Sequence, residues 1–122
     1  MRPLIVALLL GCLVLTAGPF VSMVSAADKF VPGTEDLPLM PGLIPVRNGG
    51  VVFDKPQGRI VEAAAKGKVS RNAVMKFYQA SLPQLGWTPA GTTRFQREGE
   101  KLSLDFTGED GNLTVAFTLE PQ

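Results

Sequence analysis

Residues 101–119 read KLSLDFTGEDGNLTVAFTL. Apolar and polar side chains alternate through 101–107 and again through 113–119, which is the period of a half-buried β-strand. Between the two runs stands Glu109-Asp110-Gly111-Asn112, and an Asp-Gly pair is a strong hairpin signal. The stretch therefore predicts two antiparallel strands with one apolar and one polar face. The apolar face carries Leu102, Leu104, Phe106, Leu113, Val115, Phe117 and Leu119, and the polar face carries Ser103, Asp105, Thr107, Thr114, Ala116 and Thr118.

Residues 70–98 predict a helix followed by a further strand. Ser70 is a good N-cap, and a stripe of apolar side chains recurs at steps of three and four. Pro83 disfavours helix at the residue before it, so the helix is expected to end near residues 80–82. Gly86 then closes a looser turn, and residues 92–98, with Phe95, form a third strand beside the hairpin. The stripe consists of Val74, Phe77, Tyr78, Ser81, Leu82 and Leu85.

Residues 51–69 predict a second hairpin. Residues 51–53 form a short strand, residues 55–58 (Lys-Pro-Gln-Gly) a tight turn, and residues 59–69 the returning strand. The inward row of that strand is mostly Ala and Gly, so we expect the helix to approach it closely. The element order is thus β-β-α-β-β-β. It predicts a two-layer α+β fold, with an antiparallel sheet of about five strands and one helix packed on one face.

Residues 28–50 predict an extended, Pro/Gly-rich arm ahead of the α+β domain at 51–122. Its prolines remove N–H donors and favour extended backbone. The arm is nevertheless apolar, which leaves two interpretations: it packs on the sheet, or it docks a partner. Trp87 and Tyr78 likewise either pack in the core or form a ligand wall. The candidate partner or ligand surface is therefore Leu39, Met40, Leu43, Tyr78 and Trp87.

Residues 1–27 predict a secretory signal peptide. A single positive charge, Arg2, precedes an apolar run over residues 4–17, and small residues allow cleavage after Ala26 or Ala27. Two alternatives remain: an uncleaved anchor in the inner membrane, and lipidation at Cys12, which follows a lipobox-like Leu-Leu-Gly. Cleavage places the mature chain in the periplasm or outside the cell, and membrane contact is expected only under the two alternatives.

Cleavage changes the composition of the chain. Removing 27 of 122 residues leaves 95, enough for one domain. Twelve Lys and Arg residues become 11 without Arg2, against 11 Asp and Glu, and the only cysteine is lost. A neutral chain has no overall field that draws it to nucleic acid, and basic residues with interleaved aromatics are missing. We therefore expect no nucleic-acid partner.

The side-chain inventory predicts no catalytic residues, no cofactor and no metal site. The chain has no histidine, which is the commonest general base and transition-metal ligand near neutral pH. Without a mature cysteine, thiol chemistry and thiolate metal sites are lost as well. The remaining catalytic hypothesis is a weak hydrolase that uses Tyr78 with the carboxylates Glu98, Glu100 and Asp105.

Several short motifs carry a resemblance. Residues 37–43 (Leu-Pro-Leu-Met-Pro-Gly-Leu) precede a hairpin and a helix with Phe77-Tyr78 that ends in Leu85-Gly86-Trp87. This order resembles a family of small exported bacterial domains. The chain is also similar to exported proteobacterial proteins that share residues 53–56 (Phe-Asp-Lys-Pro) and 82–87 (Leu-Pro-Gln-Leu-Gly-Trp). The resemblance implies the fold and the compartment, and it implies no activity and no binding residues.

Together these features predict a non-catalytic exported module of the bacterial cell envelope that binds a protein or a small ligand. The carboxylate-dependent hydrolase is one alternative. A membrane-tethered accessory protein with an uncleaved N-terminal anchor is the other.

Overall fold

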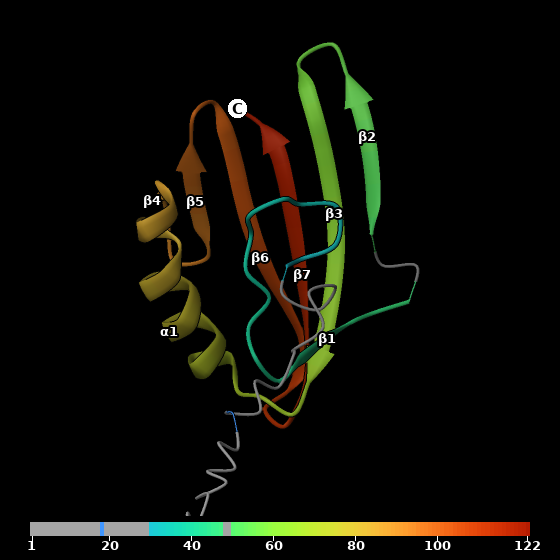
Figure 1. Ribbon diagram of the computed structural model, residues 1–122, viewed down its shortest axis with the longest axis vertical. Coiled ribbons are helices and arrows are strands. Elements are labelled where there is room, and N and C mark those ends of the chain that lie inside the picture. Colours follow the sequence, from blue (N-terminus) through green and yellow to red (C-terminus); the bar gives the residue numbers. More distant parts are fainter. Residues whose placement is uncertain (1–17, 19–29, 48–49) are drawn as a thin grey trace, which may run out of the picture.

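The computed structural model describes residues 18, 30–47 and 50–122. Within them the chain forms a mixed α+β fold with one short helix and an open antiparallel sheet of seven strands (Figure 1). The predicted class, the single helix and the antiparallel sheet are confirmed. The predicted signal peptide at 1–27, including Cys12 and both cleavage positions, lies outside the described residues apart from Gly18.

The C-terminal half forms the regular part of the sheet. Strands β5 (Arg94–Arg97), β6 (Glu100–Glu109) and β7 (Asn112–Pro121) pair in succession. Glu109 pairs with Asn112 around the two-residue Asp-Gly turn, which confirms the predicted hairpin. Burial along β7 also alternates as predicted. Its Leu, Val and Phe residues are buried, and the Thr and Ala residues between them are half-buried. Local periodicity is sufficient here because each strand pairs with its neighbour in the sequence.

Helix α1 (Arg71–Ser81) begins and ends where its sequence signals predict. The Ser70 hydroxyl accepts a hydrogen bond from the Ala73 N–H at 3.0 Å, which caps the first turn. Pro83 starts the 3₁₀-helix η2 (Pro83–Leu85), and Gly86 ends it with a left-handed φ of 90°. The buried side chains of α1 include Tyr78, whose ring meets Phe117 of β7 edge to face at 5.5 Å. The helix therefore packs on the apolar face of the sheet.

The sheet has the order β1-β3-β7-β6-β5-β4, and β2 also pairs with β3. Strand β3 (Gly58–Gly67) forms the expected hairpin with β2 (Val51–Lys55). The expectation of about five strands omitted β1 (Leu43–Pro45) and β4 (Thr88–Pro89). Strands of two or three residues show no alternation, and a proline in each was interpreted as a breaker. Strand β1 exists because β3, which is not its neighbour in the sequence, supplies its hydrogen-bonding partner, whereas β4 pairs with the next strand, β5.

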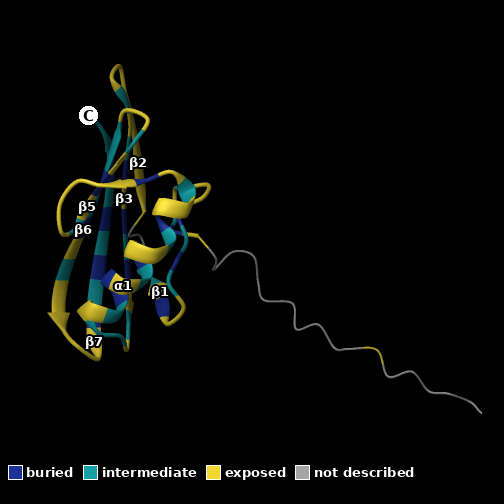
Figure 2. Cartoon of the chain, turned by 90° about the vertical axis from the view of Figure 1, so that its left-hand side faces the viewer, coloured by how far each residue is buried: buried dark blue, intermediate teal, exposed yellow. Residues whose placement is uncertain are grey.

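The second layer over the sheet is built from two segments rather than one. The expectation that the helix lies over the small residues of β3 requires correction. The segment at 30–43 crosses β7 and β3, while α1 lies beside β5 and β6 (Figure 1). A Cβ added at Gly33 of this segment would stand 2.9 Å from Val61 of β3. Figure 2 shows α1 and this segment on the same side of the sheet. The segment at 30–43, rather than the helix, therefore makes the close approach to β3.

The predicted arm at 28–50 is docked, and its described part is folded back on itself. The Val31 N–H donates to the Leu37 carbonyl at 2.9 Å, and Phe30 forms an isolated bridge with Pro38. Further along, Leu43 pairs with Gly67 to begin β1. The arm contributes four buried side chains to the core: Val31, Leu37, Leu39 and Leu43. Of the two interpretations left open by the sequence, the described residues take the one in which the arm covers the sheet.

Candidate functional site

The five candidate surface residues lie inside the structure. Leu39, Leu43, Tyr78 and Trp87 are buried, and Met40 is half-buried against the core. They come from the arm, from α1 and from the chain entering β4, and they hold these elements together. In this arrangement they pack against the domain and do not form an exposed surface.

Tyr78 connects the helix to the arm through its hydroxyl group. The hydroxyl donates to the Pro38 carbonyl at 2.8 Å and accepts from the Met40 N–H at 3.3 Å. Burial raises the pKa of Tyr78 well above its usual value, and the hydrogen bond from Met40 lowers it by less. The phenol is therefore neutral and engaged on both sides, which is a structural arrangement rather than that of a general base.

Arg97 is the centre of a second contact between the arm and the sheet. Its guanidinium donates to Asp36 of the arm at 2.7 Å and to the Leu85 carbonyl at 3.0 Å. It also lies over the Trp87 ring, 4.4 Å from the centroid. The hydrogen bond to Asp36 raises the pKa of Arg97, so the side chain stays charged. Sixty-one positions separate Arg97 from Asp36, which is why no local pattern in the sequence predicts this pair.

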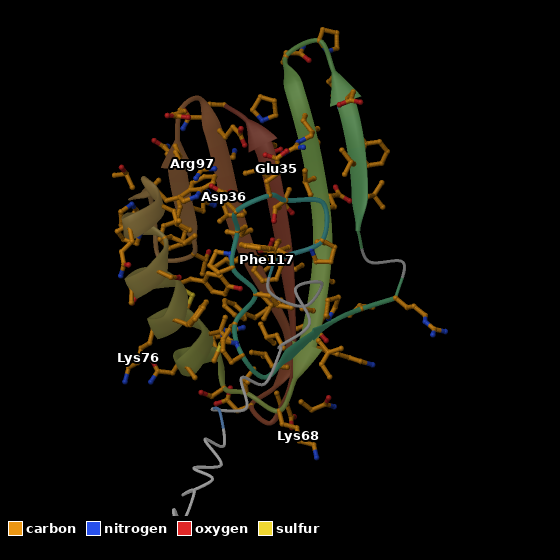
Figure 3. The ribbon with its side chains drawn as sticks, in the orientation of Figure 1. Glu35, Asp36, Lys68, Lys76, Arg97 and Phe117 are labelled. Atoms are coloured by element: carbon orange, nitrogen blue, oxygen red, sulfur yellow. The ribbon has the colours of Figure 1, made fainter. Side chains whose placement is uncertain are left out.

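A polar cavity of about 240 Å³ lies beside this pair, between the arm and the inner face of the sheet. Arg97 and Asp36 stand on one side of it, and Glu35 enters from the arm (Figure 3). Trp87 also lines it, and the buried indole N–H of Trp87 has no hydrogen-bond partner among the described residues. A buried donor of this kind requires an acceptor, so the cavity is suited to water or a small ligand with an acceptor oxygen. The remaining lining residues are Thr34, Leu37, Arg59, Glu100 and Leu119.

The three carboxylates considered for catalysis do not form one site. Glu100 lines the cavity. Glu98 stands in the β5–β6 turn with φ 47° and borders a different depression. Asp105 pairs with Ala116 and is exposed on the outer face of the sheet, opposite to α1. Tyr78 is buried under the arm, and none of the three cavities found among the described residues is lined by two of these four residues.

The most exposed apolar feature of the described residues is strand β2. All five of its residues are exposed. We call Val51, Val52 and Phe53 the apolar edge, since β2 pairs with β3 on one side and with no described strand on the other. Val52 and Phe53 are each 48% exposed. The sequence predicted this strand without identifying a surface. One signal for this surface was available in the sequence: three consecutive apolar residues, without the usual alternation, in a predicted strand next to a turn.

The apolar edge continues onto the outer face of the sheet. Directly paired residues of an antiparallel ladder share a face. Phe53 pairs with Ile60 and Val51 with Glu62, so these side chains lie on the outer face. Ile44 of β1 pairs with Lys66 on the same face and is 68% exposed. Val52 pairs with the buried Val61 and therefore lies on the inner face. The apolar edge thus presents hydrophobic side chains on both faces of one strand.

No helix among the described residues has the length and apolar character needed to cross a membrane. In the same residues no group of three or more acidic, histidine or cysteine side chains is placed to hold a metal ion. No family model matches the chain, and no curated protein and no solved structure matches it either.

Proposed function

We propose that this chain is a non-catalytic, exported module of the bacterial cell envelope that binds a protein partner through the apolar edge. The observation that carries the proposal is the exposure of Val51, Val52 and Phe53 on a strand that has a described neighbour, β3, on one side only. Exposed apolar strands at sheet edges are normally shielded, because they pair readily with other chains. The absence of histidine and the expected loss of the only cysteine support a binding role over catalysis.

Site-specific photocrosslinking in living cells tests this proposal. A photoreactive amino acid at position 53 of the full-length chain, produced in a proteobacterial host, is expected to form a discrete protein adduct. The matched control places the same group at position 96, because Gln96 is exposed on the outer face of β5 and is polar. Identical adducts from both positions, or none from position 53, would contradict the proposal.

A second candidate function is the binding of a small polar ligand in the cavity. It is favoured by the unpartnered Trp87 N–H and by Arg59, which lines the cavity and forms no ion pair with the described residues. An indole N–H and a guanidinium are both donors, so a small carboxylate or phosphate would suit them.

Trp87 is the only tryptophan, so its fluorescence reports on the cavity directly. Titration with acetate, glycine or inorganic phosphate is expected to give a saturable change that Arg59→Gln weakens at least about tenfold. Arg94→Gln is the control, because Arg94 is exposed on another strand and does not line the cavity. No saturable change with any of the three probes would exclude these ligands.

A further inference from the structure

Of the described strands at the margins of the sheet, β2 is the longest and the only one without proline. Strand β4 has two residues and contains Pro89, while β1 has three and contains Pro45. Short length and proline are both devices that prevent an edge from pairing with another chain. Strand β2 has five residues, and its two charges, Asp54 and Lys55, stand at one end, after the three consecutive residues of the apolar edge. Its free side is therefore competent to accept a further strand.

The distribution of apolar side chains indicates how the edge is covered. Val51 and Phe53 lie on the outer face, and Val52 lies on the inner face. A partner that docks flat on the outer face, such as a helix or a lipid surface, would leave Val52 exposed. A strand added beside β2 places side chains on both faces and satisfies the outward N–H and C=O groups as well. Strand addition thus covers the whole apolar edge.

We infer that the added strand is β2 of a second copy, paired antiparallel and centred on Phe53. This inference rests on the proposed function, because it names the partner of the apolar edge. Directly opposite residues of an antiparallel pair lie on the same face of the sheet. The two-fold axis that relates the two copies must therefore pass between one residue of β2 and the same residue of the second copy. Centring on Asp54 would oppose two carboxylates. Centring on Val52 would pair only residues 51–53, whereas centring on Phe53 pairs all of 51–55.

Side-chain chemistry supports the Phe53-centred register. The two Phe53 rings meet across the axis, and cross-strand aromatic pairs stabilise antiparallel sheets. Lys55 stands opposite Val51 of the second copy on the outer face. The next residue along that row is Glu62 of the second copy, since Val51 pairs with Glu62. The Lys55 side chain can extend over the small valine toward this carboxylate. By symmetry, Lys55 of one copy lies near Glu62 of the other at each end of the interface.

The expected dimer is weak. Five residue pairs form a contact below the roughly 1,200 Å² of a standard interface. We therefore expect self-association in the micromolar range or weaker, about 10 µM to 1 mM. The full-length gene is expressed, and the chain is purified in the form that the cell exports. Its sedimentation velocity should show a concentration-dependent increase toward twice the monomer mass over that range. A monomer at about 1 mM overturns the inference.

Single cysteines test the register. In a Cys12→Ser background the introduced cysteine is the only one, whether or not the N-terminus is removed. The variants are Val51→Cys, Val52→Cys, Phe53→Cys, Asp54→Cys and Lys55→Cys, with Gln96→Cys as an exposed control. Only position 53 faces itself, with Cβ atoms about 4.5 Å apart, at the upper end of the range that a disulfide spans. Phe53→Cys is expected to oxidise to a dimer at least about tenfold faster than the others. Fastest oxidation at another position, or equal rates at all, overturns the register.

A charge on the edge tests the surface without removing Phe53. Val52→Glu is expected to abolish self-association, because in the Phe53-centred register residue 52 stands opposite Asp54 of the second copy and two carboxylates would face each other. Gln96→Glu is the control for the added charge, and the far-UV circular dichroism of both variants should equal that of the parent chain. Dimerisation unchanged by Val52→Glu overturns the inference.

The outcomes separate this inference from the proposed function. If position 53 crosslinks to a different envelope protein and the chain stays monomeric at about 1 mM, the second copy is excluded and the protein-binding function stands. If position 53 gives no adduct and the chain is monomeric, both fail. An adduct at twice the mass of the chain, together with rapid oxidation of Phe53→Cys, supports both.

Discussion

At the residue scale, two side chains decide how the arm is held. Tyr78 bonds to the arm backbone at Pro38 and Met40, and Arg97 bonds to Asp36. The two contacts differ in strength. The Tyr78 hydroxyl is buried, so loss of its hydrogen bonds would leave the Pro38 carbonyl and the Met40 N–H without partners away from water. The Asp36 side chain is half exposed, and exposed ion pairs contribute little because solvent screens them. We therefore assign the larger stabilising contribution to Tyr78.

Replacing Tyr78 with phenylalanine tests this assignment. Tyr78→Phe removes the donor to Pro38 and the acceptor of Met40 and keeps the ring contact with Phe117. The free energy of unfolding is expected to fall by about 1–2 kcal/mol. Urea unfolding followed by circular dichroism measures the change. Ser81→Ala is the control, because the Ser81 hydroxyl bonds only within the helix, to Phe77. A loss for Tyr78→Phe no larger than that of the control would contradict the assignment.

The raised pKa of Tyr78 predicts an alkaline loss of stability. The unfolded chain gives up this proton near pH 10.0, while the folded chain keeps it to a higher pH because the phenol is buried. Above pH 10 the unfolded state therefore binds fewer protons, and the free energy of unfolding falls as the pH rises. Below pH 10 this contribution is fully present.

Tyr78 is the only tyrosine, so ultraviolet absorbance follows its ionisation directly. In the parent chain, ionisation should begin well above pH 10 and coincide with unfolding. Tyr78→Phe should lack this component of the pH dependence. A folded protein that titrates at the usual tyrosine value would show that the arm leaves Tyr78 accessible.

At the element scale, the attachment of β1 to β3 depends on a close approach of backbones. Gly42 and Leu43 of the arm lie directly over Gly67, and a Cβ added at Gly67 would meet the Gly42 carbonyl oxygen and backbone. Backbone is less able to move aside than a flexible side chain. The glycine at the end of β3 thus permits the short strand that anchors the arm.

Gly67→Ala is expected to cost about 2 kcal/mol of unfolding free energy and to detach β1. Hydrogen exchange should then accelerate at the Val46 amide, which bonds to the Ala64 carbonyl of β3. Gly91→Ala is the control, since its Cβ would find only ordinary contacts with Arg94 and its φ lies outside the left-handed region. Unchanged exchange at the Val46 amide would show that β1 does not depend on this approach.

At the scale of the whole molecule, the N-terminus decides where the protein acts. Cleavage after Ala26 or Ala27 would leave a neutral chain without cysteine. The intact mass of the protein isolated from its native source is expected to match a chain that begins at Ala27 or Asp28. A full-length mass would support the uncleaved anchor, and a mass with lipid on Cys12 would support a lipoprotein. Either result would contradict the proposed export of a free module.

Much of the fold follows from the sequence because its signals are local. Ser70, Pro83 and Gly86 mark the helix and its end through their own backbone chemistry. The Asp-Gly turn and the alternation around it define β6 and β7. For the candidate site the sequence was less informative. The strand containing Val51, Val52 and Phe53 was predicted, but exposure of both its faces follows from its place at the margin of the sheet.

The sequence by itself determined the α+β class, the helix with its cap, and the C-terminal hairpin, because each depends on residues within a few positions of one another. It also determined the absence of histidine and the single cysteine at position 12. Only the tertiary structure decided that the arm covers β3, that Leu39, Tyr78 and Trp87 are internal, and that β2 has no described strand on its outer side. Those features depend on contacts between distant segments, such as Pro38 with Tyr78, and no local periodicity encodes such pairings.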